Sequence, residues 1–276
     1  MKLLVVGGRG MAGHLLVRYF RAEPGCEVVY TTRDETDLEG RQLDVRDSEA
    51  VAALVEEVRP DIIINAVGVL NEDAERHPLL AYQVNGLLPH WLRHLADYWG
   101  SRLIHISSDC VFDGSKGGYS EDAIPDGLTV YARTKALGEV RDPRHLTIRT
   151  SIIGPEIRSN GIGLLQWFLR QEGEVSGYSR VMWNGVTTLE LAKAIAYAIA
   201  RPDIGGLVHL TAAETVSKLE LLRLFRNCFA RPYVSIMPCE RIAIDRSLQC
   251  MREDWRYESP RYNVMLEELA QWMKDN

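Results

Sequence analysis

Short apolar runs alternate with helix-like segments through the first half of the chain. Near-continuous apolar runs are typical of strands that are buried on both faces of a sheet. Because helix-like segments separate the runs, the pattern predicts an α/β fold with a doubly wound, parallel sheet of the Rossmann type. The runs occupy residues 2–6, 26–30, 61–67, 102–107 and 145–150.

Two of the intervening segments carry clear helical signals. Apolar residues recur at three- and four-residue steps from about residue 77 to 98, which predicts one amphipathic helix. The segment 48–60 predicts another helix, with Ser48 as its N-cap and Pro60 at its end.

The pattern loosens after about residue 150. Residues 154–163 are expected to form a loop, and residues 188–200 a strong helix capped by Thr188. The apolar run 206–210 predicts a late strand of the first sheet. The tail from about 211 mixes short helices with irregular segments.

These boundaries predict a Rossmann core and a smaller C-terminal substrate lobe. The core is expected to span residues 1–155, with residues 186–210 rejoining it. Residues 156–185 and 211–276 are expected to form the lobe that binds the substrate.

Composition narrows the class of protein. The 276 residues carry a net charge of −6, which gives no basic footprint for nucleic acid. No apolar run is long enough for a membrane helix, and the N-terminal run is too short for a signal peptide. The five cysteines are scattered and form no CxxC pair, which is typical of reduced thiols in a cytoplasmic protein.

No metal site is expected. His90 and His94 are spaced as a helical pair of metal ligands, but no glutamate lies between them as in an HExxH motif. The simpler interpretation is a polar helix surface.

A glycine loop follows the first apolar run. In "VVGGRGMAG", Gly7, Gly10 and Gly13 form a GxxGxxG pattern directly after a predicted strand and before a predicted helix. Glycines let the backbone approach a pyrophosphate, and the helix N-terminus offers it N–H groups. The loop, including Met11, is therefore predicted to bind a dinucleotide.

The end of the second strand indicates which dinucleotide binds. An acidic residue there favours NAD, whereas an arginine favours the 2′-phosphate of NADP. Both types are present, as Arg33 and Asp34. NADPH is favoured through Arg33, and NADH is possible; the simpler interpretation of Arg33 is a side chain that faces solvent. Asp44 and Val45 follow the third strand and are expected beside the adenine.

Two further strand ends belong to the same edge of the sheet, where open α/β folds bind their ligands. Ala66, Val67 and Gly68 of "NAVG" are expected to pass close to the cofactor, and Ser107, Ser108 and Asp109 to lie near the nicotinamide.

Tyr131 and Lys135 lie four residues apart on the next predicted helix, so their side chains share one face. A lysine beside a phenol favours the phenolate and lowers its pKa, which makes an acid/base for neutral pH.

Together these motifs resemble the extended short-chain dehydrogenases/reductases and, within them, the dTDP-4-dehydrorhamnose reductase family. The resemblance rests on the glycine loop, "LDVRD", "NAVG", "EDAERHP" leading to Val84–Asn85, and "SSDCVFDG" with "YSEDAIPDGLTVYARTKALGE". It covers residues 1–155 well and residues 156–276 more weakly.

The resemblance implies NAD(P)H-dependent reduction of the 4-keto group of a nucleotide-activated 6-deoxy sugar. In that family such a step serves dTDP-rhamnose and cell-wall polysaccharide synthesis. Tyr131 would be the general acid, Lys135 would tune it and bind the nicotinamide ribose, and Ser108 would polarise the carbonyl. Asn85 matches a helix asparagine near the cofactor.

Four residues are expected on the substrate side. Asp109 matches the family, whereas Cys110 replaces its usual tyrosine. Trp183 stands in a loop that departs from the family pattern, where it either stacks on a sugar or base or packs in the core. Arg246 either binds the diphosphate or makes a surface salt bridge.

Other activities remain open. A 4,6-dehydratase needs an Asp–Glu pair, which is Asp109–Cys110 here, so dehydration lacks its base. A non-catalytic NADP-binding regulatory subunit and a nucleotide-sugar epimerase are the two alternatives. The nucleotide, the sugar and the oligomeric state are left open; relatives are often homodimers.

Overall fold

The computed structural model describes residues 1–157 and 161–275. Residues 158–160 of the expected loop 154–163 therefore lie outside the described part of the chain. No helix in the described ranges has the length and apolarity needed to cross a membrane.

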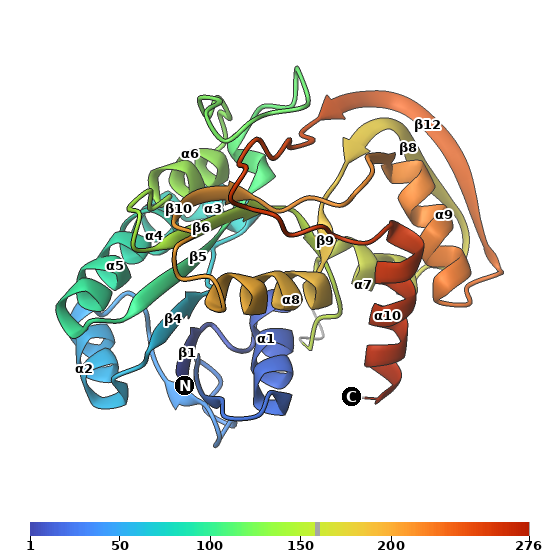
Figure 1. The fold of residues 1–276 in the computed structure, drawn as a ribbon. Helices are drawn as coiled ribbons and strands as arrows, with labels where there is room; N and C mark the ends of the chain where they lie inside the picture. The colour runs from blue at the N-terminus through green and yellow to red at the C-terminus, as the bar shows by residue number, and fades with distance from the viewer. Residues whose placement is uncertain (158–160, 276) are drawn as a thin grey trace.

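Seven parallel strands form the central sheet (Figure 1), which confirms the predicted fold class. All five apolar runs of the first half are strands, and the run near residue 206 adds β10 beside β6, as predicted. The spatial order is β10 (Gly206–His209), β6 (Leu146–Thr150), β5 (Arg102–Ser108), β4 (Ile62–Asn65), β1 (Lys2–Val6), β2 (Glu27–Thr32) and β3 (Arg41–Gln42).

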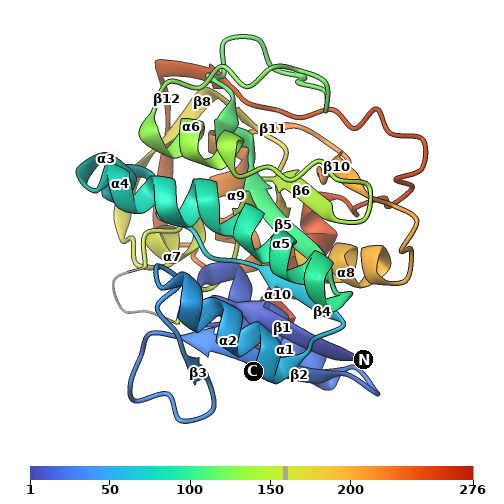
Figure 2. The same ribbon diagram turned by 90° about the vertical axis from the view of Figure 1, so that its left-hand side faces the viewer.

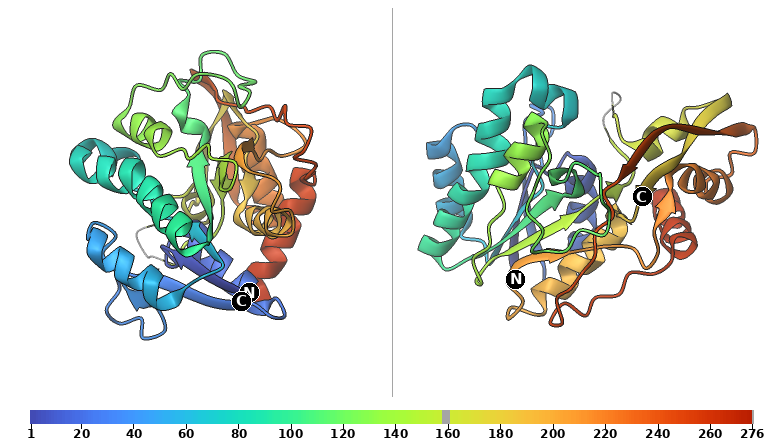
Figure 3. Two further views of the ribbon diagram at one scale, coloured as in Figure 1. Left: turned by 60° about the vertical axis from the view of Figure 1, so that its left-hand side comes forward. Right: turned by 90° about the horizontal axis from the view of Figure 1, so that it is seen from above.

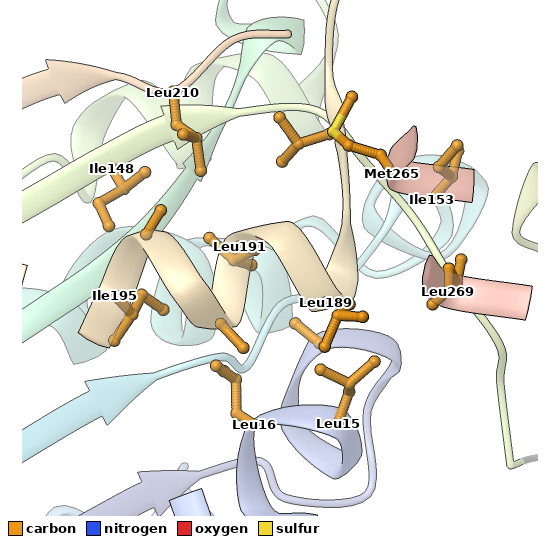
Figure 4. Close-up of a cluster of buried hydrophobic side chains, with 14 of the residues drawn as sticks. Leu15, Leu16, Ile148, Ile153, Leu189, Leu191, Ile195, Leu210, Met265 and Leu269 are labelled. Carbon is orange, nitrogen blue, oxygen red and sulfur yellow. The ribbon is translucent and has the colours of Figure 1, made fainter. Parts of the chain in front are cut away.

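Helices cover both faces of this sheet (Figure 2). α1 (Met11–Ala22) and α8 (Thr188–Ile199) pack together on one face. Figure 4 draws leucines of α1 against Leu189, Leu191 and Ile195 of α8. α2 (Ser48–Val58) and α5 (Leu88–Trp99) enclose a second apolar core on the other face. Each sheet face is thus buried, as its continuous apolar strands require.

The helix expected over residues 77–98 is broken into three parts. They are α4 (Pro78–Ala81), a π-helix η1 (Tyr82–Leu87) and α5. Pro89 lacks the N–H that would donate to the carbonyl of Asn85. Gly138 also approaches that carbonyl so closely that a Cβ would overlap it. The periodicity predicted the helix but not this break.

Both predicted N-caps are wrong by one residue. Asp47, rather than Ser48, accepts hydrogen bonds from Glu49 N and Ala50 N, at 3.0 Å each. Thr187, rather than Thr188, accepts from the backbone N of the third residue of α8 at 3.1 Å. In each case the neighbouring polar residue begins the helix instead.

A smaller sheet lies beside the central one (Figure 3). β8 (Gly173–Trp183) pairs with both β11 (Val216–Ser217) and β12 (Val234–Asp245). The tail is therefore more regular than expected. The remaining elements are α3 (Asn71–Arg76), η2 (Asp109–Val111), α6 (Val130–Leu137), β7 (Ile152–Ile153), α7 (Leu164–Leu169), β9 (Val186–Thr187), α9 (Lys218–Cys228) and α10 (Tyr262–Asp275).

A buried ion pair joins the end of α6 to the central sheet. Arg149 on β6 is fully buried and donates to Glu139 through Nε at 2.8 Å and Nη2 at 2.6 Å. Ser107 on β5 donates to the same carboxylate at 2.9 Å. The remaining Arg149 nitrogen, Nη1, lies 3.0 Å from Nε2 of His209 on β10. Three neighbouring strands thus share one charged centre.

We expect Arg149→Met to lower the free energy of unfolding by about 3–5 kcal/mol, because it strands the Glu139 carboxylate in the core. Urea unfolding measures this change. Arg76→Met breaks an exposed pair with Glu72 and is the matched control, expected to cost less than about 0.5 kcal/mol. Equal effects of the two variants would contradict a structural role for the buried pair.

Candidate active site

The glycine loop between β1 and α1 is shaped by close backbone contacts. Gly7 has φ +90°, and a Cβ there would lie 2.6 Å from the Val67 side chain. A Cβ at Gly13 would overlap the Gly7 carbonyl, and one at Gly8 would overlap the Tyr30 ring. Gly8 was not singled out from the sequence, because only the fold brings Tyr30 against it.

The start of α1 has the features of an anion site. No side chain caps the helix at Gly10, and its first turn carries no acidic residue. The first N–H groups of such a helix and its positive dipole end favour a phosphate. Met11 begins the helix, and its side chain lies against Gly163.

At the end of β2, both oxygens of Asp34 are occupied. Arg9 of the glycine loop donates to Oδ2 at 3.1 Å, and the Thr36 hydroxyl donates to Oδ1 at 2.6 Å. Arg33 is exposed and, among the described residues, makes no hydrogen bond or ion pair. The sequence did not indicate Arg9, whose partner lies on another strand end.

Asp44 faces an arginine of its own loop. Arg46 Nε donates to both oxygens of Asp44, at 2.8 and 2.9 Å. This hydrogen bonding lowers the pKa of Asp44. The Asp44 carboxylate therefore stays ionised beside the expected adenine position, and Val45 follows it on the partly buried side of the loop.

The loop after β4 is held by two asparagines. Asn65 Oδ1 accepts from Val67 N at 3.2 Å. Asn85 on the π-helix pairs with the Val69 backbone, accepting from N at 2.8 Å and donating to O at 2.9 Å. Asn85 also donates to Thr134 Oγ1 at 3.2 Å. Its amide is thus used in positioning the loop that contains Ala66, Val67 and Gly68.

Ser108, Tyr131 and Lys135 meet where β5 ends and α6 begins. Thr129 caps α6 by accepting from Ala132 N at 3.1 Å. Ser108 Oγ donates to Asp109 Oδ1 and accepts from Cys110 N, both at 3.1 Å. A hydrogen bond with Ser108 also acts on Tyr131. The structure therefore brings the predicted hydroxyl and phenol together.

The pKa of Tyr131 is raised, not lowered as the sequence suggested. Burial is the main cause, and the hydrogen bond with Ser108 opposes it. Burial also lowers the pKa of Lys135 to about 8, and the Lys135 ammonium donates to Ile106 O at 2.7 Å. Burial is the largest effect on both groups, and the phenol stays protonated.

Asp109 and Cys110 lie in a poorly hydrated part of the site. Burial raises the pKa of Asp109, with Lys218 chief among the groups that oppose the shift. Burial raises the pKa of the Cys110 thiol to about 12. Both groups therefore favour their neutral forms more than they would in water.

Arg246 lies beside Cys110, and its guanidinium contacts backbone carbonyls. Its Nε donates to Phe112 O at 2.8 Å, and Nη2 approaches Asp113 O at 3.4 Å. No salt bridge holds it among the described residues. Arg246 thus holds the loop after Cys110, and its described contacts include no surface salt bridge; its expected contact with the diphosphate stays a prediction.

Trp183 is a core residue rather than an open stacking surface. It is 4% exposed, and its ring stacks on Tyr262 with centroids 5.5 Å apart. Its Nε1 donates to Ser151 Oγ at 2.8 Å. Burial leaves no open face for a sugar or a base, so the buried alternative holds.

Lys218 is a site residue that the sequence did not indicate. It begins α9, and its ammonium lies 4.4 Å from the centroid of the Trp183 ring. Asp109 and Cys110 act on it electrostatically, although they lie in η2, directly after β5 of the central sheet. The pairing of β11 with β8 brings it there, and no local pattern reveals that pairing.

The arrangement fits a carbonyl reduction or its reverse. A protonated phenol and a serine hydroxyl converge where β5 ends, and the glycine loop opens an anion site at the same edge of the sheet. These are the parts of a hydride-transfer site, with a proton donor at the reacting oxygen.

Comparisons with known proteins show the family of this chain and its fold. The family model described as the RmlD substrate binding domain matches residues 1–252. A dTDP-4-keto-6-deoxy-D-glucose reductase of Streptomyces niveus is 34% identical over 254 residues, covering 87% of this chain and 83% of the relative.

A Haloferax volcanii protein named as a low-salt glycan biosynthesis reductase is 35% identical over 178 residues, or 60% of this chain. The alignment spans 59% of that relative's length, which is less than two thirds. A dTDP-4-dehydrorhamnose reductase of Bacillus anthracis in complex with NADP has a TM-score of 0.84 at 21% identity. The comparison covers 100% of this chain and 99% of that one and establishes the same fold.

We expect Asn85→Ala to lower the free energy of unfolding by about 1–3 kcal/mol, because the Val69 N–H and C=O lose their partner. Amide hydrogen exchange at Val69 should rise in the same variant. Gln83→Ala is the control, since Gln83 is exposed on the same π-helix. Unchanged exchange at Val69 would rule out the positioning role of Asn85.

Proposed function

This chain belongs to the family of the RmlD substrate binding domain, and we propose that it reduces the 4-keto group of a nucleotide-activated 6-deoxy sugar with NADPH. The observation that carries the proposal is the meeting of Ser108 with a protonated Tyr131 at the end of β5. The activity in the name of the Streptomyces niveus relative supports the substrate class.

The residues at the edge of the sheet fit a dinucleotide. The uncapped start of α1 suits the pyrophosphate, and Gly13 lets α1 approach Gly7 closely. The loop of Ala66, Val67 and Gly68, which Asn85 holds through Val69, would pass close to the nicotinamide. Lys135 lies one helical turn from Tyr131 and would bind the hydroxyls of the nicotinamide ribose.

When bound, NADPH supplies the hydride that reaches C4 of the sugar. Ser108 turns its hydroxyl from Asp109 to the keto oxygen and polarises the carbonyl. Tyr131 holds a proton on Oη and gives it to the same oxygen as negative charge develops there. Lys135 in its charged form stabilises the resulting phenolate.

The contacts at the end of β2 support NADPH over NADH. An NAD-binding acid must be free to accept from two ribose hydroxyls. Asp34 is not free in this way, because Arg9 and Thr36 occupy its carboxylate. Arg33 and Arg9 then provide positive charge for a 2′-phosphate.

Two further points belong to the same proposal. A cytoplasmic location suits the five free cysteines of the chain. A homodimer is supported by exposed apolar side chains on the neighbouring elements α4, η1 and α6, since Leu79 is 80%, Leu87 59% and Leu137 48% exposed.

The test is NADPH consumption with dTDP-, GDP-, UDP- and CDP-linked 4-keto-6-deoxy sugars. We expect turnover with at least one of them. Tyr131→Phe should lower kcat more than about 100-fold, because it removes the proton donor, while NADPH binding by fluorescence titration stays intact.

Tyr98→Phe is the matched control, since Tyr98 is 71% exposed on α5. Tight cofactor binding without turnover of any sugar would favour the regulatory subunit, whereas sugar isomerisation without net NADPH loss would favour the epimerase. Full activity of the Tyr131→Phe variant would remove Tyr131 from its role.

Arg33→Gln tests the cofactor choice. We expect the KM for NADPH to rise about 10–100-fold with the KM for NADH unchanged, because a charge-assisted bond to the 2′-phosphate is lost. Arg41→Gln is the control on the neighbouring strand, where Arg41 pairs with Glu57. An equal effect on both cofactors would contradict this role of Arg33.

A further inference from the structure

Lys218 is held at the site by the smaller sheet. Ser217 and Glu220 form a capping box that starts α9 directly at Lys218. Val216 and Ser217 pair with Trp183 and Met182 of β8. The backbone on both sides of Lys218 is therefore fixed, and its ammonium lies over the Trp183 ring.

The helix terminus does not favour this residue. A cation at the first position of a helix faces the positive end of the dipole. Burial adds a second cost and lowers the pKa of Lys218 to about 8. A lysine kept there against both effects is expected to have a compensating partner.

The described residues compensate the charge of the Lys218 ammonium only in part. The ammonium lies over the Trp183 ring, which Tyr262 and Ser151 lock in place. Asp109 acts on it electrostatically, but no hydrogen bond or ion pair within 4.0 Å joins the Lys218 ammonium to any residue of the described ranges. Three N–H donors thus remain for a ligand.

The neighbouring charge indicates which ligand group fits. A diphosphate would be repelled by Asp109, whereas a hydroxyl can accept from an ammonium and donate to a carboxylate at once. Asp109 directly follows Ser108, whose hydroxyl takes the keto oxygen under the proposed function. In a 4-keto-6-deoxy sugar, the hydroxyl next to the keto carbon is on C3.

We propose that Lys218 is a substrate-contact residue: its ammonium donates to the C3 hydroxyl oxygen of the keto sugar, while Asp109 accepts from that hydroxyl. This inference rests on the proposed function and deepens it. The Lys218–Asp109 pair then fixes the ring orientation and hence the face of C4 that receives hydride. Trp183 acts on the substrate only through Lys218.

The test compares wild type, Lys218→Met and Lys274→Met on the keto sugar that the wild type reduces and on its 3-deoxy analogue. Lys274 is exposed at the end of α10 and serves as the control. For the wild type, we expect kcat/KM to fall about 10–100-fold when the hydroxyl is removed. Lys218→Met should lower kcat/KM on the keto sugar by a similar factor, and its kcat/KM should then be the same for both compounds.

Thermal unfolding separates this effect from misfolding, since removing a poorly compensated buried cation should leave Tm unchanged or higher. Equal losses by Lys218→Met on both compounds, or no loss on either, would overturn the inference alone. Weaker inhibition of that variant by the free nucleoside diphosphate would also overturn it and assign Lys218 to the phosphates. A wild type that reduces no sugar would instead overturn the proposed function, and this inference with it.

Discussion

The buried pair of Glu139 and Arg149 is the interaction on which the site geometry depends. Two unlike charges in a dry core must each be satisfied from several directions. Arg149 meets this need with two bonds to Glu139 and a contact with His209. Glu139 stands just after α6, the helix of Tyr131 and Lys135. Fixing this carboxylate therefore also fixes the helix against β5, which ends at Ser108.

The contacts around Glu139 and Arg149 continue through His209 and Glu121 to the C-terminal segment. His209 N donates to Glu121 at 3.1 Å, and the other oxygen of Glu121 accepts from Met251 N at 3.0 Å. Nearby, Asn184 pairs with the Leu248 backbone at 2.7 and 3.0 Å. These bonds join the strand ends of the large sheet to the segment that follows β12. Lys218, at the start of α9, lies close enough to Asp109 for their charges to interact.

Much of this could be read from the sequence, for a physical reason. Strands buried on both faces have unbroken apolar runs in the sequence, and a GxxGxxG loop is a pattern of residues close together in the chain. What the sequence missed depends on partners far along the chain. Asn85 was expected near the cofactor, and its hydrogen bonds with the Val69 backbone were not predicted. Trp183 had two interpretations that only its packing on Tyr262 decides. Arg9 contacts Asp34 at the end of another strand, and Lys218 reaches the site through the pairing of β11 with β8. No local sequence pattern predicts either arrangement.

The raised pKa of Tyr131 overturns the prediction of a lowered pKa, and it suits the proposed reduction better. A lysine beside a phenol suggested a lowered pKa, which suits a base that removes a proton from an alcohol. Reduction needs the opposite, since the donor must still hold its proton when the alkoxide forms. Burial keeps the phenol neutral, and the sugar alkoxide is a stronger base than a phenolate, so the proton moves downhill. The charge left on Tyr131 after transfer is where Lys135 becomes useful. The desolvated site is thus set for the reductive direction, with the lysine stabilising the product state of the proton donor.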